Sequence, residues 1–423
     1  MKRLLPASWR EARLGFLVET QVPQRDKPDP LTGPIPWVRI EDFDGQDIRA
    51  SKSGQGVTPE QVRAMNLRVF EPGTVMCSCS CSMGATAIVR EPLVSNQTFI
   101  GLKPGKELEP RFLFYLMGAM REELQANATG AIQQYLSRDD FRSLRIPLPP
   151  LNQQRRIADF LDSETARIDS LSALRERQVQ LAFTRLESLA KQETGRILIR
   201  GAKEPSGEWM TYPLRRAISG IKTGATPPGS EPEPWTEGTH PDTIPWYGPS
   251  SFQGIMHLGT PVKHLPSAAV KERVVPFFAK GSVLIIGIGA TAGKVAYLDH
   301  DASANQQITA LTPERGVSGK FLAWQLWAAT QELRELAPYT TLPIINNDFL
   351  KSFPIAMPPT DFQQAVVQKL DCVAERVGAL HAAAAQASKL TQERRQSLIT
   401  AAVTGQFDVS TASGRNVTEG VTA

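Results

Sequence analysis

The sequence predicts an α+β protein with two tandem copies of one globular domain, each followed by a long helix. Three observations lead to this prediction. Short motifs recur in the same order about 209 residues apart. Each copy mixes short β-branched runs and Gly/Pro turns with one helical stretch, and each is followed by a long segment of helical apolar periodicity.

The repeat establishes the domain organisation. Eight collinear matches at offsets of 205 to 210 residues are too many for chance, and the period is too long for a solenoid. The clearest pairs are Ile35-Pro36-Trp37 with Ile244-Pro245-Trp246, Gly84-Ala85-Thr86-Ala87 with Gly289-Ala290-Thr291-Ala292, Asn96-Gln97 with Asn305-Gln306, Asp140-Phe141 with Asp348-Phe349, Pro149-Pro150 with Pro358-Pro359, and Gln153-Gln154 with Gln363-Gln364.

Each globular part has the same order of elements. The β-branched and aromatic runs predict strands near 37–40, 74–77, 283–286 and 294–298. One helix is expected near Pro110 to Leu124, and its counterpart near Gly319 to Leu336. The double prolines close each globular part, because proline interrupts strand pairing and disfavours a helical residue before it.

The segments after the double prolines predict two long amphipathic helices. Each has only one apolar stripe, so the two helices most simply bury their stripes on each other. A glycine at 405 should end the second helix. The predicted seam consists of Ile157, Leu161, Ile168, Leu171 and Leu189 in the first helix, and Leu370, Val373, Val377, Leu380, Ala384 and Ala387 in the second.

These patterns divide the chain into six segments. We predict globular domains at 1–149 and 209–358, long helices at 150–192 and 359–405, a linker at 193–208, and a flexible C-terminal tail at 406–423.

Composition limits the class of protein. The chain has 423 residues, a net charge of +4 and only four cysteines, which favours a reducing cytoplasm over a disulfide-stapled fold. Pro6 interrupts the N-terminal apolar residues, so no secretory signal is expected. The longest apolar run, near 283–288, is far too short to span a bilayer.

No catalytic motif is recognisable. The segment 283–295 resembles a nucleotide loop, but Ile288 and Val295 replace its first glycine and its hydroxyl residue, so a strand-turn-strand hairpin is favoured. Cys77, Cys79 and Cys81 alternate, which is typical of small side chains on one face of a strand. All five histidines lie in the second half, which excludes a duplicated histidine site. We expect no catalytic, cofactor-binding or metal site.

Polar loop residues at corresponding places in both copies are the candidate binding residues. Arg, Lys, Gln, Asn, Ser and Thr side chains contact phosphates and base edges, and aromatic side chains stack or pack on sugars. The same residue types also simply populate loops. The candidates are Arg49, Ser51, Lys52, Gln97, Gln133, Gln134 and Tyr135 in the first copy, and Lys222, Thr223, Ser250, Ser251, Lys294, Tyr339 and Asn346 in the second.

This layout resembles the specificity subunit of a type I restriction-modification system over about residues 1–405. The resemblance rests on the Ile-Pro-Trp starts, the Gly-Ala-Thr segments, the Asn-Gln pairs and the twin stretches 146–154 and 354–364, each of which opens a long helix. The family usually has Glu-Gln after the double proline, whereas both copies here have Gln-Gln.

The resemblance implies a fold and a role. Two target-recognition domains would be separated by two long helices in an intramolecular antiparallel coiled coil, and each domain would read half of an asymmetric bipartite sequence in double-stranded DNA. Two modification (methyltransferase) subunits would dock on the helices, and restriction (translocase and nuclease) subunits would join them. Those partners would bind S-adenosylmethionine, ATP and Mg, and the modification subunit would flip the target adenine out of the stack. The complex would be cytoplasmic and associated with the nucleoid.

Two other functions are weighed against this one. The first is a coiled-coil scaffold with two protein-binding domains, which differs from a DNA-binding subunit because DNA binding should weaken steeply with ionic strength as counterions are released. A nucleotide-dependent enzyme using the segment 283–295 would be stabilised by its nucleotide.

Overall fold

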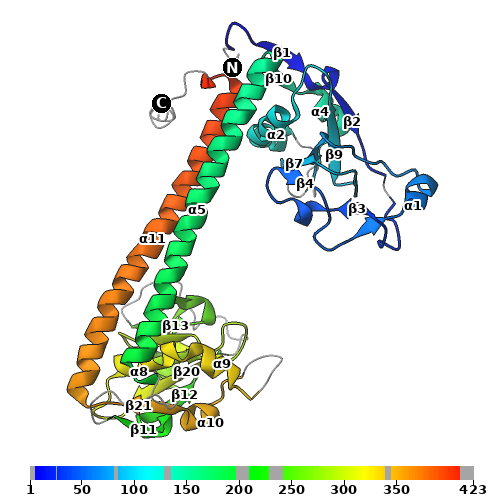
Figure 1. The fold of residues 1–423 in the computed structure, drawn as a ribbon. Coiled ribbons are helices and arrows are strands. Elements are labelled where there is room, and N and C mark those ends of the chain that lie inside the picture. Colours follow the sequence, from blue (N-terminus) through cyan, green and yellow to red (C-terminus); the bar gives the residue numbers. More distant parts are fainter. Residues whose placement is uncertain are drawn as a thin grey trace. The chain divides into compact units, whose positions relative to one another are not determined.

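The computed structural model describes residues 5–24, 26–80, 84–127, 135–196, 209–227, 242–338 and 344–409 (Figure 1). It divides into two compact units. The first contains Met1–Ala173 with Ala387–Ala423, and the second contains Leu174–Gln386. The boundary between the units falls inside both long helices, so each unit holds one globular domain and parts of two helices.

The first domain is built on a five-stranded sheet in the order β2-β9-β6-β7-β4, in which only β4 and β7 pair in parallel. The order β5-β3-β8 forms a smaller sheet, and β1 pairs with β10. The strands are β1 (Arg10–Arg13), β2 (Val18–Gln21), β3 (Ile35–Val38), β4 (Asp47–Ile48), β5 (Gly56–Val57), β6 (Val75–Ser78), β7 (Thr86–Val89), β8 (Val94–Ser95), β9 (Phe99–Pro104) and β10 (Arg145–Leu148).

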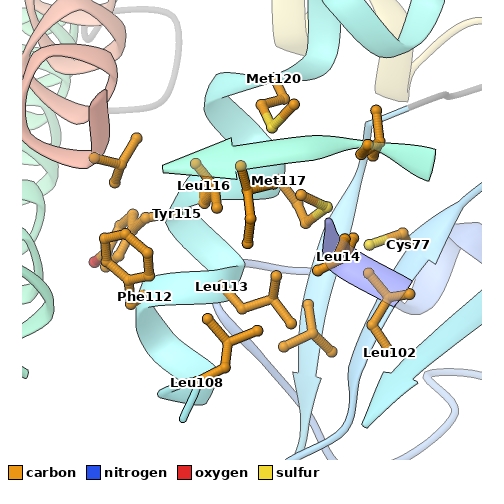
Figure 2. Close-up of a cluster of buried hydrophobic side chains, with 14 of the residues drawn as sticks. Leu14, Cys77, Leu102, Leu108, Phe112, Leu113, Tyr115, Leu116, Met117 and Met120 are labelled. Atoms are coloured by element: carbon orange, nitrogen blue, oxygen red, sulfur yellow. The ribbon is translucent and has the colours of Figure 1, made fainter. Parts of the chain in front are cut away.

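The core of the first domain lies between the large sheet and a helix. In the described part of this domain, the α-helices are α1 (Pro59–Ala64), α2 (Pro110–Ala119), α3 (Arg121–Asn127) and α4 (Arg138–Ser143). Helix α2 packs on β6 and β7, and Figure 2 shows its Leu113 and Met117 beside Cys77 and Leu102 of the strands. Alternate residues of β6 therefore face this helix, as the period of a strand requires.

The second domain repeats this plan. Its main sheet has the order β12-β20-β17-β18, and α8 packs on it. The strands are β11 (Met210–Pro213), β12 (Ile218–Thr223), β13 (Thr243–Tyr247), β14 (Phe252–Gln253), β15 (His257–Leu258), β16 (Lys263–Pro266), β17 (Val283–Ile286), β18 (Val295–Tyr297), β19 (Ser303–Ala304), β20 (Ile308–Pro313) and β21 (Pro354–Met357). The helices are α7 (Ser267–Lys271), α8 (Gly319–Ala328), α9 (Thr330–Glu335) and α10 (Asn347–Ser352).

The α+β prediction is confirmed, but the single helix expected in each copy is wrong. The first is divided at Met120 into α2 and α3, and the second is divided at Ala329 into α8 and α9. Both residues have ψ near zero, at 8° and 6°, and both side chains are buried. Tertiary packing at these two residues redirects the chain although the apolar periodicity continues.

Two long helices follow the domains, and their packing is antiparallel within each unit. Helix α5 (Leu151–Glu193) has 43 residues and α11 (Thr360–Thr404) has 45. In the first unit the start of α5 shares a buried cluster with the end of α11. In the second unit the end of α5 shares a buried cluster with the start of α11.

The predicted seam is buried or half-buried at every position but one. Ile157, Leu161, Ile168, Leu370 and Val377 are buried, and Leu189, Val373, Leu380, Ala384 and Ala387 are half-buried. Leu171 is the exception, because it is 43% exposed. Several seam residues were missed by the periodicity, namely Leu186, Ala190, Val366, Leu398, Ile399, Ala402 and Val403.

A glycine ends each long helix against a tryptophan. Gly405 follows α11 with φ of +77°, as predicted, and a Cβ there would lie 3.2 Å from Trp9 Cζ3. Gly195 follows α5 with φ of +70°, and a Cβ there would lie 2.5 Å from Trp209 Cζ3. Left-handed backbone and close ring contact both require glycine. The end of α11 thus contacts the start of the first domain as the end of α5 contacts the start of the second.

Candidate nucleic-acid interface

The glycine-rich segment 287–294 is the turn of a β-hairpin. Strands β17 and β18 pair in antiparallel fashion on either side of it, with Ile285 opposite Val295. A dinucleotide or phosphate loop would instead lead from a strand into a helix. The hairpin interpretation is therefore confirmed, and the nucleotide-loop alternative is contradicted by the local fold.

The same hairpin corrects the alignment of the two copies. Ser78 N donates to Ala85 O (2.8 Å) in the first copy, and Ile286 N donates to Lys294 O (2.9 Å) in the second. Thr86 lies in strand β7, whereas Thr291 lies in the turn. The pairing of 84–87 with 289–292 is therefore wrong, because the second turn is one residue longer and Gly84 corresponds to Gly293.

The cysteines of β6 and its end are interior side chains. Cys77 and Cys79 are buried, and burial, reinforced by the neighbouring Cys79, raises the pKa of the Cys77 thiol. A protonated thiol is a poor nucleophile and a poor metal ligand. Within the residues described, no group of three or more His, Cys, Asp or Glu side chains could hold a metal ion. Cys81 lies outside the described residues.

Three candidates of the first copy lie in a loop organised by Asp42. Its carboxylate accepts bonds from Arg39 N and Lys52 N, each at 2.7 Å, and from the Ser51 hydroxyl at 3.5 Å. Ser51 is buried and supports the loop. Arg49 and Lys52 are exposed, with ion-pair distances of 3.7 Å to Asp47 and 3.4 Å to Asp44.

The repeated Asn-Gln pair forms the same turn in both copies. Asn96 Oδ1 accepts from Thr98 N, and Asn305 Oδ1 accepts from Gln307 N (3.0 Å). The asparagine therefore shapes the turn, as short amide side chains commonly do. Gln97 is exposed at the tip of the first turn, whereas Gln306 accepts a bond from Thr226 in the second.

Three candidates of the second copy are used in local structure. Ser251 is buried and donates to Thr260 O (3.0 Å), and Asn346 caps helix α10 by accepting from Phe349 N (2.8 Å). Thr223 lies 3.2 Å from the Thr309 hydroxyl. A side chain satisfied in this way is less available to a ligand. Among the other candidates, Lys222, Ser250, Lys294 and Tyr135 are exposed, while Gln133, Gln134 and Tyr339 lie outside the described residues.

Two cavities are lined by candidate binding residues, and Lys294 lines the larger of these two. A cavity of about 750 Å³ in the second unit is lined by Lys294, Arg334 and His257 of the domain and by Phe183 and Glu187 of α5. Glu187 also pairs with Lys191 at 2.6 Å. The lysine and the arginine in its lining suit a phosphate group, and Phe183 adds an apolar side chain.

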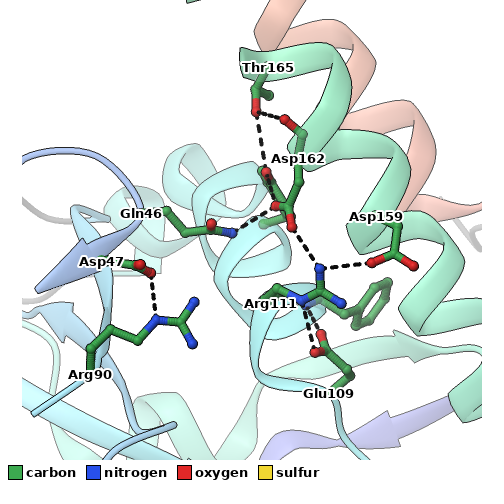
Figure 3. A network of polar contacts seen from close by, with 10 residues as sticks. Gln46, Asp47, Arg90, Glu109, Arg111, Asp159, Asp162 and Thr165 are labelled. Carbon is green, nitrogen blue, oxygen red and sulfur yellow. Dashed lines mark hydrogen bonds and ion pairs between the residues drawn. The ribbon is translucent and has the colours of Figure 1, made fainter. Parts of the chain in front are cut away.

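A polar anchor that the sequence analysis missed attaches the first domain to α5. Asp162 of α5 accepts from Arg111 Nη1 (2.7 Å) and Gln46 Nε2 (2.9 Å), as Figure 3 shows. It also accepts from the Tyr115 hydroxyl (2.7 Å). Arg111 also lies 2.8 Å from Asp159. Burial raises the pKa of Tyr115, so its hydroxyl remains a donor to Asp162.

The second unit has an equivalent anchor, with each residue 209 positions later. Asp371 of α11 lies 2.6 Å from Lys320 Nζ and accepts from Trp324 Nε1 at 2.9 Å. The sequence contains a signal for this anchor, because a cation, an aromatic donor and an aspartate recur in both copies with the same separations. The sequence analysis did not use it, because charged groups on a helix are usually solvated.

A buried glutamine at the start of each long helix completes the anchor. Gln154 Oε1 accepts from Glu109 N, and its Nε2 donates to Pro149 O, both at 2.9 Å. Gln363 makes the same bonds, to Ser318 N (2.8 Å) and Pro358 O (2.9 Å). Gln154 therefore corresponds to Gln363, and the pairing of 153–154 with 363–364 was displaced by one residue.

One protein-family model matches both copies of the repeat. This model, described as the type I restriction modification DNA specificity domain, matches residues 8–179 and again residues 207–385.

In the described part of the chain, no helix is apolar over a length that would cross a membrane.

Related proteins carry the same description. The type I restriction enzyme MjaIX specificity subunit of Methanocaldococcus jannaschii is 29% identical over 132 residues, which are 30% of this chain and 31% of that protein. The EcoprrI specificity subunit of Escherichia coli is 30% identical over 148 residues, 34% of this chain and 36% of that protein. These two alignments span about a third of each relative's length.

Solved structures share the fold along nearly the whole chain. A chain described under "Structural basis underlying complex assembly and conformational transition of the type I R-M system" has a TM-score of 0.73 at 22% identity, covering 95% of this chain and 99% of that one. The HsdS subunit from Thermoanaerobacter tengcongensis has a TM-score of 0.53 at 22% identity, covering 95% and 98%. The two family matches coincide with the two copies of the repeat and cover most of the sequence, and the chain therefore belongs to the family of type I restriction modification DNA specificity domains.

Proposed function

We propose that this chain is the DNA-recognition subunit of a type I restriction-modification complex, in which each domain reads one half of an asymmetric bipartite site. One observation carries the proposal. The two domains share a scaffold, down to the anchor at Asp162 and Asp371, but present different polar side chains at equivalent loop positions. A common scaffold with different readout residues suits two unlike half-sites.

The partners follow from the family. We propose that two modification subunits dock on the long helices, that restriction subunits join the complex, and that S-adenosylmethionine, ATP and Mg are bound by those partners. Leu174 and Leu181 support docking in the second unit, because they are 64% and 60% exposed and lie seven residues apart on one face of α5. This chain then contributes specificity and no catalytic step. The purified chain alone should transfer no methyl group to DNA.

Exchange of one domain tests the proposal. Replacing residues 209–358 with the corresponding domain of another family member should change one half-site completely and leave the other unchanged. Base-resolution methylation sequencing of cells that also express the modification subunit measures this directly. Change of both half-sites would contradict the independence of the domains.

Binding by the purified complex distinguishes DNA recognition from a protein scaffold. Affinity for a duplex carrying the methylated motif should fall steeply with salt, because phosphate contacts release counterions. A scaffold with two protein-binding domains would bind the duplex weakly, without preference for the motif.

We further propose that helix length sets the number of unread base pairs between the half-sites. Deleting one heptad between residues 169 and 185 of α5, together with the matching heptad of α11, preserves the phase of the seam. The deletion shortens the helix pair by about 10 Å, or about three base pairs of duplex. We expect the methylated motif to lose about that many unread positions while both half-sites stay the same. An unchanged spacer would contradict this role.

A further inference from the structure

A small hollow in the first domain brings together side chains from two strand ends. It has a volume of about 240 Å³ and is lined by Lys27, Trp37, Arg39, Asn96, Gln97 and Thr98. Strands β3 and β8 pair in parallel, with Trp37 opposite Val94. Parallel neighbours end at the same edge of a sheet, so Arg39 and Gln97 emerge side by side although they are far apart in the sequence.

One backbone hydrogen bond and one ion pair position Arg39. Its backbone N donates to Asp42 Oδ2 (2.7 Å), which holds the chain where it leaves β3. Its Nε lies 3.0 Å from Glu41 Oε1, so this ion-pair distance is to Nε and not to a terminal nitrogen. The two terminal nitrogens form the edge that makes bidentate contacts with base acceptors. The side chain is 36% exposed.

Gln97 adds a side-chain amide to the lining of the hollow. Asn96 Oδ1 accepts from the Thr98 hydroxyl (2.6 Å), which closes the turn beneath Gln97. Gln97 is exposed at the tip of this turn. The buried Trp37 side chain forms part of the lining. The hollow therefore brings together a guanidinium and a carboxamide, which are groups that hydrogen-bond with nucleic-acid bases.

The second domain keeps the scaffold of this hollow and has Gln306 at the position of Gln97, but it lacks the arginine. Trp246 pairs in parallel with Ser303, as Trp37 pairs with Val94, and Asn305 forms the same turn as Asn96. Gly248 stands where the first domain has Arg39. A Cβ at Gly248 would lie 3.1 Å from Val262 Cγ2, so the valine occupies the space beside it.

We infer that the hollow of the first domain reads a guanine in the first half-site through Arg39, with Gln97 contacting the same or the adjacent base pair. The inference rests on the proposed DNA-recognition function and assigns it to particular atoms. Guanine offers N7 and O6 in the major groove, and arginine is their commonest specific partner. The second domain has no guanidinium at this position, so its half-site is read differently.

The test uses the full chain co-expressed with its modification subunits. Methylation sequencing should show that Arg39→Ala makes one guanine position of a single half-site degenerate, with preference reduced roughly 10-fold or more. The other half-site should not change. Arg63→Ala is the matched control, because Arg63 is an exposed arginine of the same domain whose ion pair is with Glu60 on α1. Arg39→Lys should retain partial preference for guanine.

Two results would contradict the role of Arg39, and a third, distinguishable from them, would contradict the proposed function. Equal weakening on all sequences, with a smaller salt dependence, would mean that Arg39 grips a phosphate and would overturn base reading. An unchanged motif, with Arg39→Ala complex melting as the wild type does, would also overturn the inference. If the wild-type complex methylates no motif that depends on this chain, the proposed function itself fails, and that result is visible before any variant is compared.

Discussion

Trp324→Ala should lower the free energy of unfolding of the second unit by about 3 to 5 kcal/mol, the usual cost of removing a large buried aromatic side chain. Trp324 of α8 is 0% exposed and belongs to the buried cluster that α8 forms with the main sheet and the two long helices. Its ring packs edge-on against Trp327, with the two ring centroids 5.3 Å apart, and its Nε1 donates to Asp371 Oδ1 at 2.9 Å. The variant therefore creates a cavity and also weakens the anchor of α11.

Trp324→Tyr is the matched variant, because tyrosine occupies the equivalent position 115 in the first unit and donates its hydroxyl to Asp162. It should lose less stability than the alanine variant, since most of the ring volume and a donor remain. Denaturant unfolding followed by tryptophan fluorescence and circular dichroism measures both. Equal losses for the two variants would contradict a packing origin for the effect.

Glu332→Ala should destabilise the second unit by about 3 to 5 kcal/mol, because it leaves a buried arginine without this carboxylate. Arg196, which follows α5, is 4% exposed, and its Nη2 lies 2.7 Å from Glu332 Oε2. The guanidinium also donates to Pro354 O (2.6 Å) and lies 4.8 Å from the Phe353 ring. This contact secures the end of α5 to the second domain.

Two further variants separate the charge effect from loss of packing. Glu335→Ala removes an exposed carboxylate from the same helix and should change stability by less than about 0.5 kcal/mol. Combining Glu332→Ala with Arg196→Met removes the buried charge itself and should restore much of the lost stability. If the double variant is no more stable than Glu332→Ala, the unpaired charge is not the cause.

The candidate site shows where prediction from sequence stops. Polar residue type predicted Ser51, Ser251 and Asn346 as binding residues, but each is used by a local bond to Asp42, Thr260 or Phe349. Arg39 was not among the candidates, because it lies inside the strand predicted near 37–40 and not in a predicted loop. Residue type gives hydrogen-bonding capacity, whereas only the folded chain decides which partner satisfies it.

The sequence by itself determined the duplication, the α+β class, the hairpins and the two long helices. These features depend on local periodicity, turn residues and motifs repeated at a fixed spacing, all of which can be read along one dimension. The tertiary structure alone decided which seam positions are buried, the correct alignment of the hairpin turns, and the meeting of Arg39 with Gln97. Those outcomes depend on strand register and on contacts between residues far apart in the chain, because side chains compete for buried space and for hydrogen-bond partners only when the chain is folded.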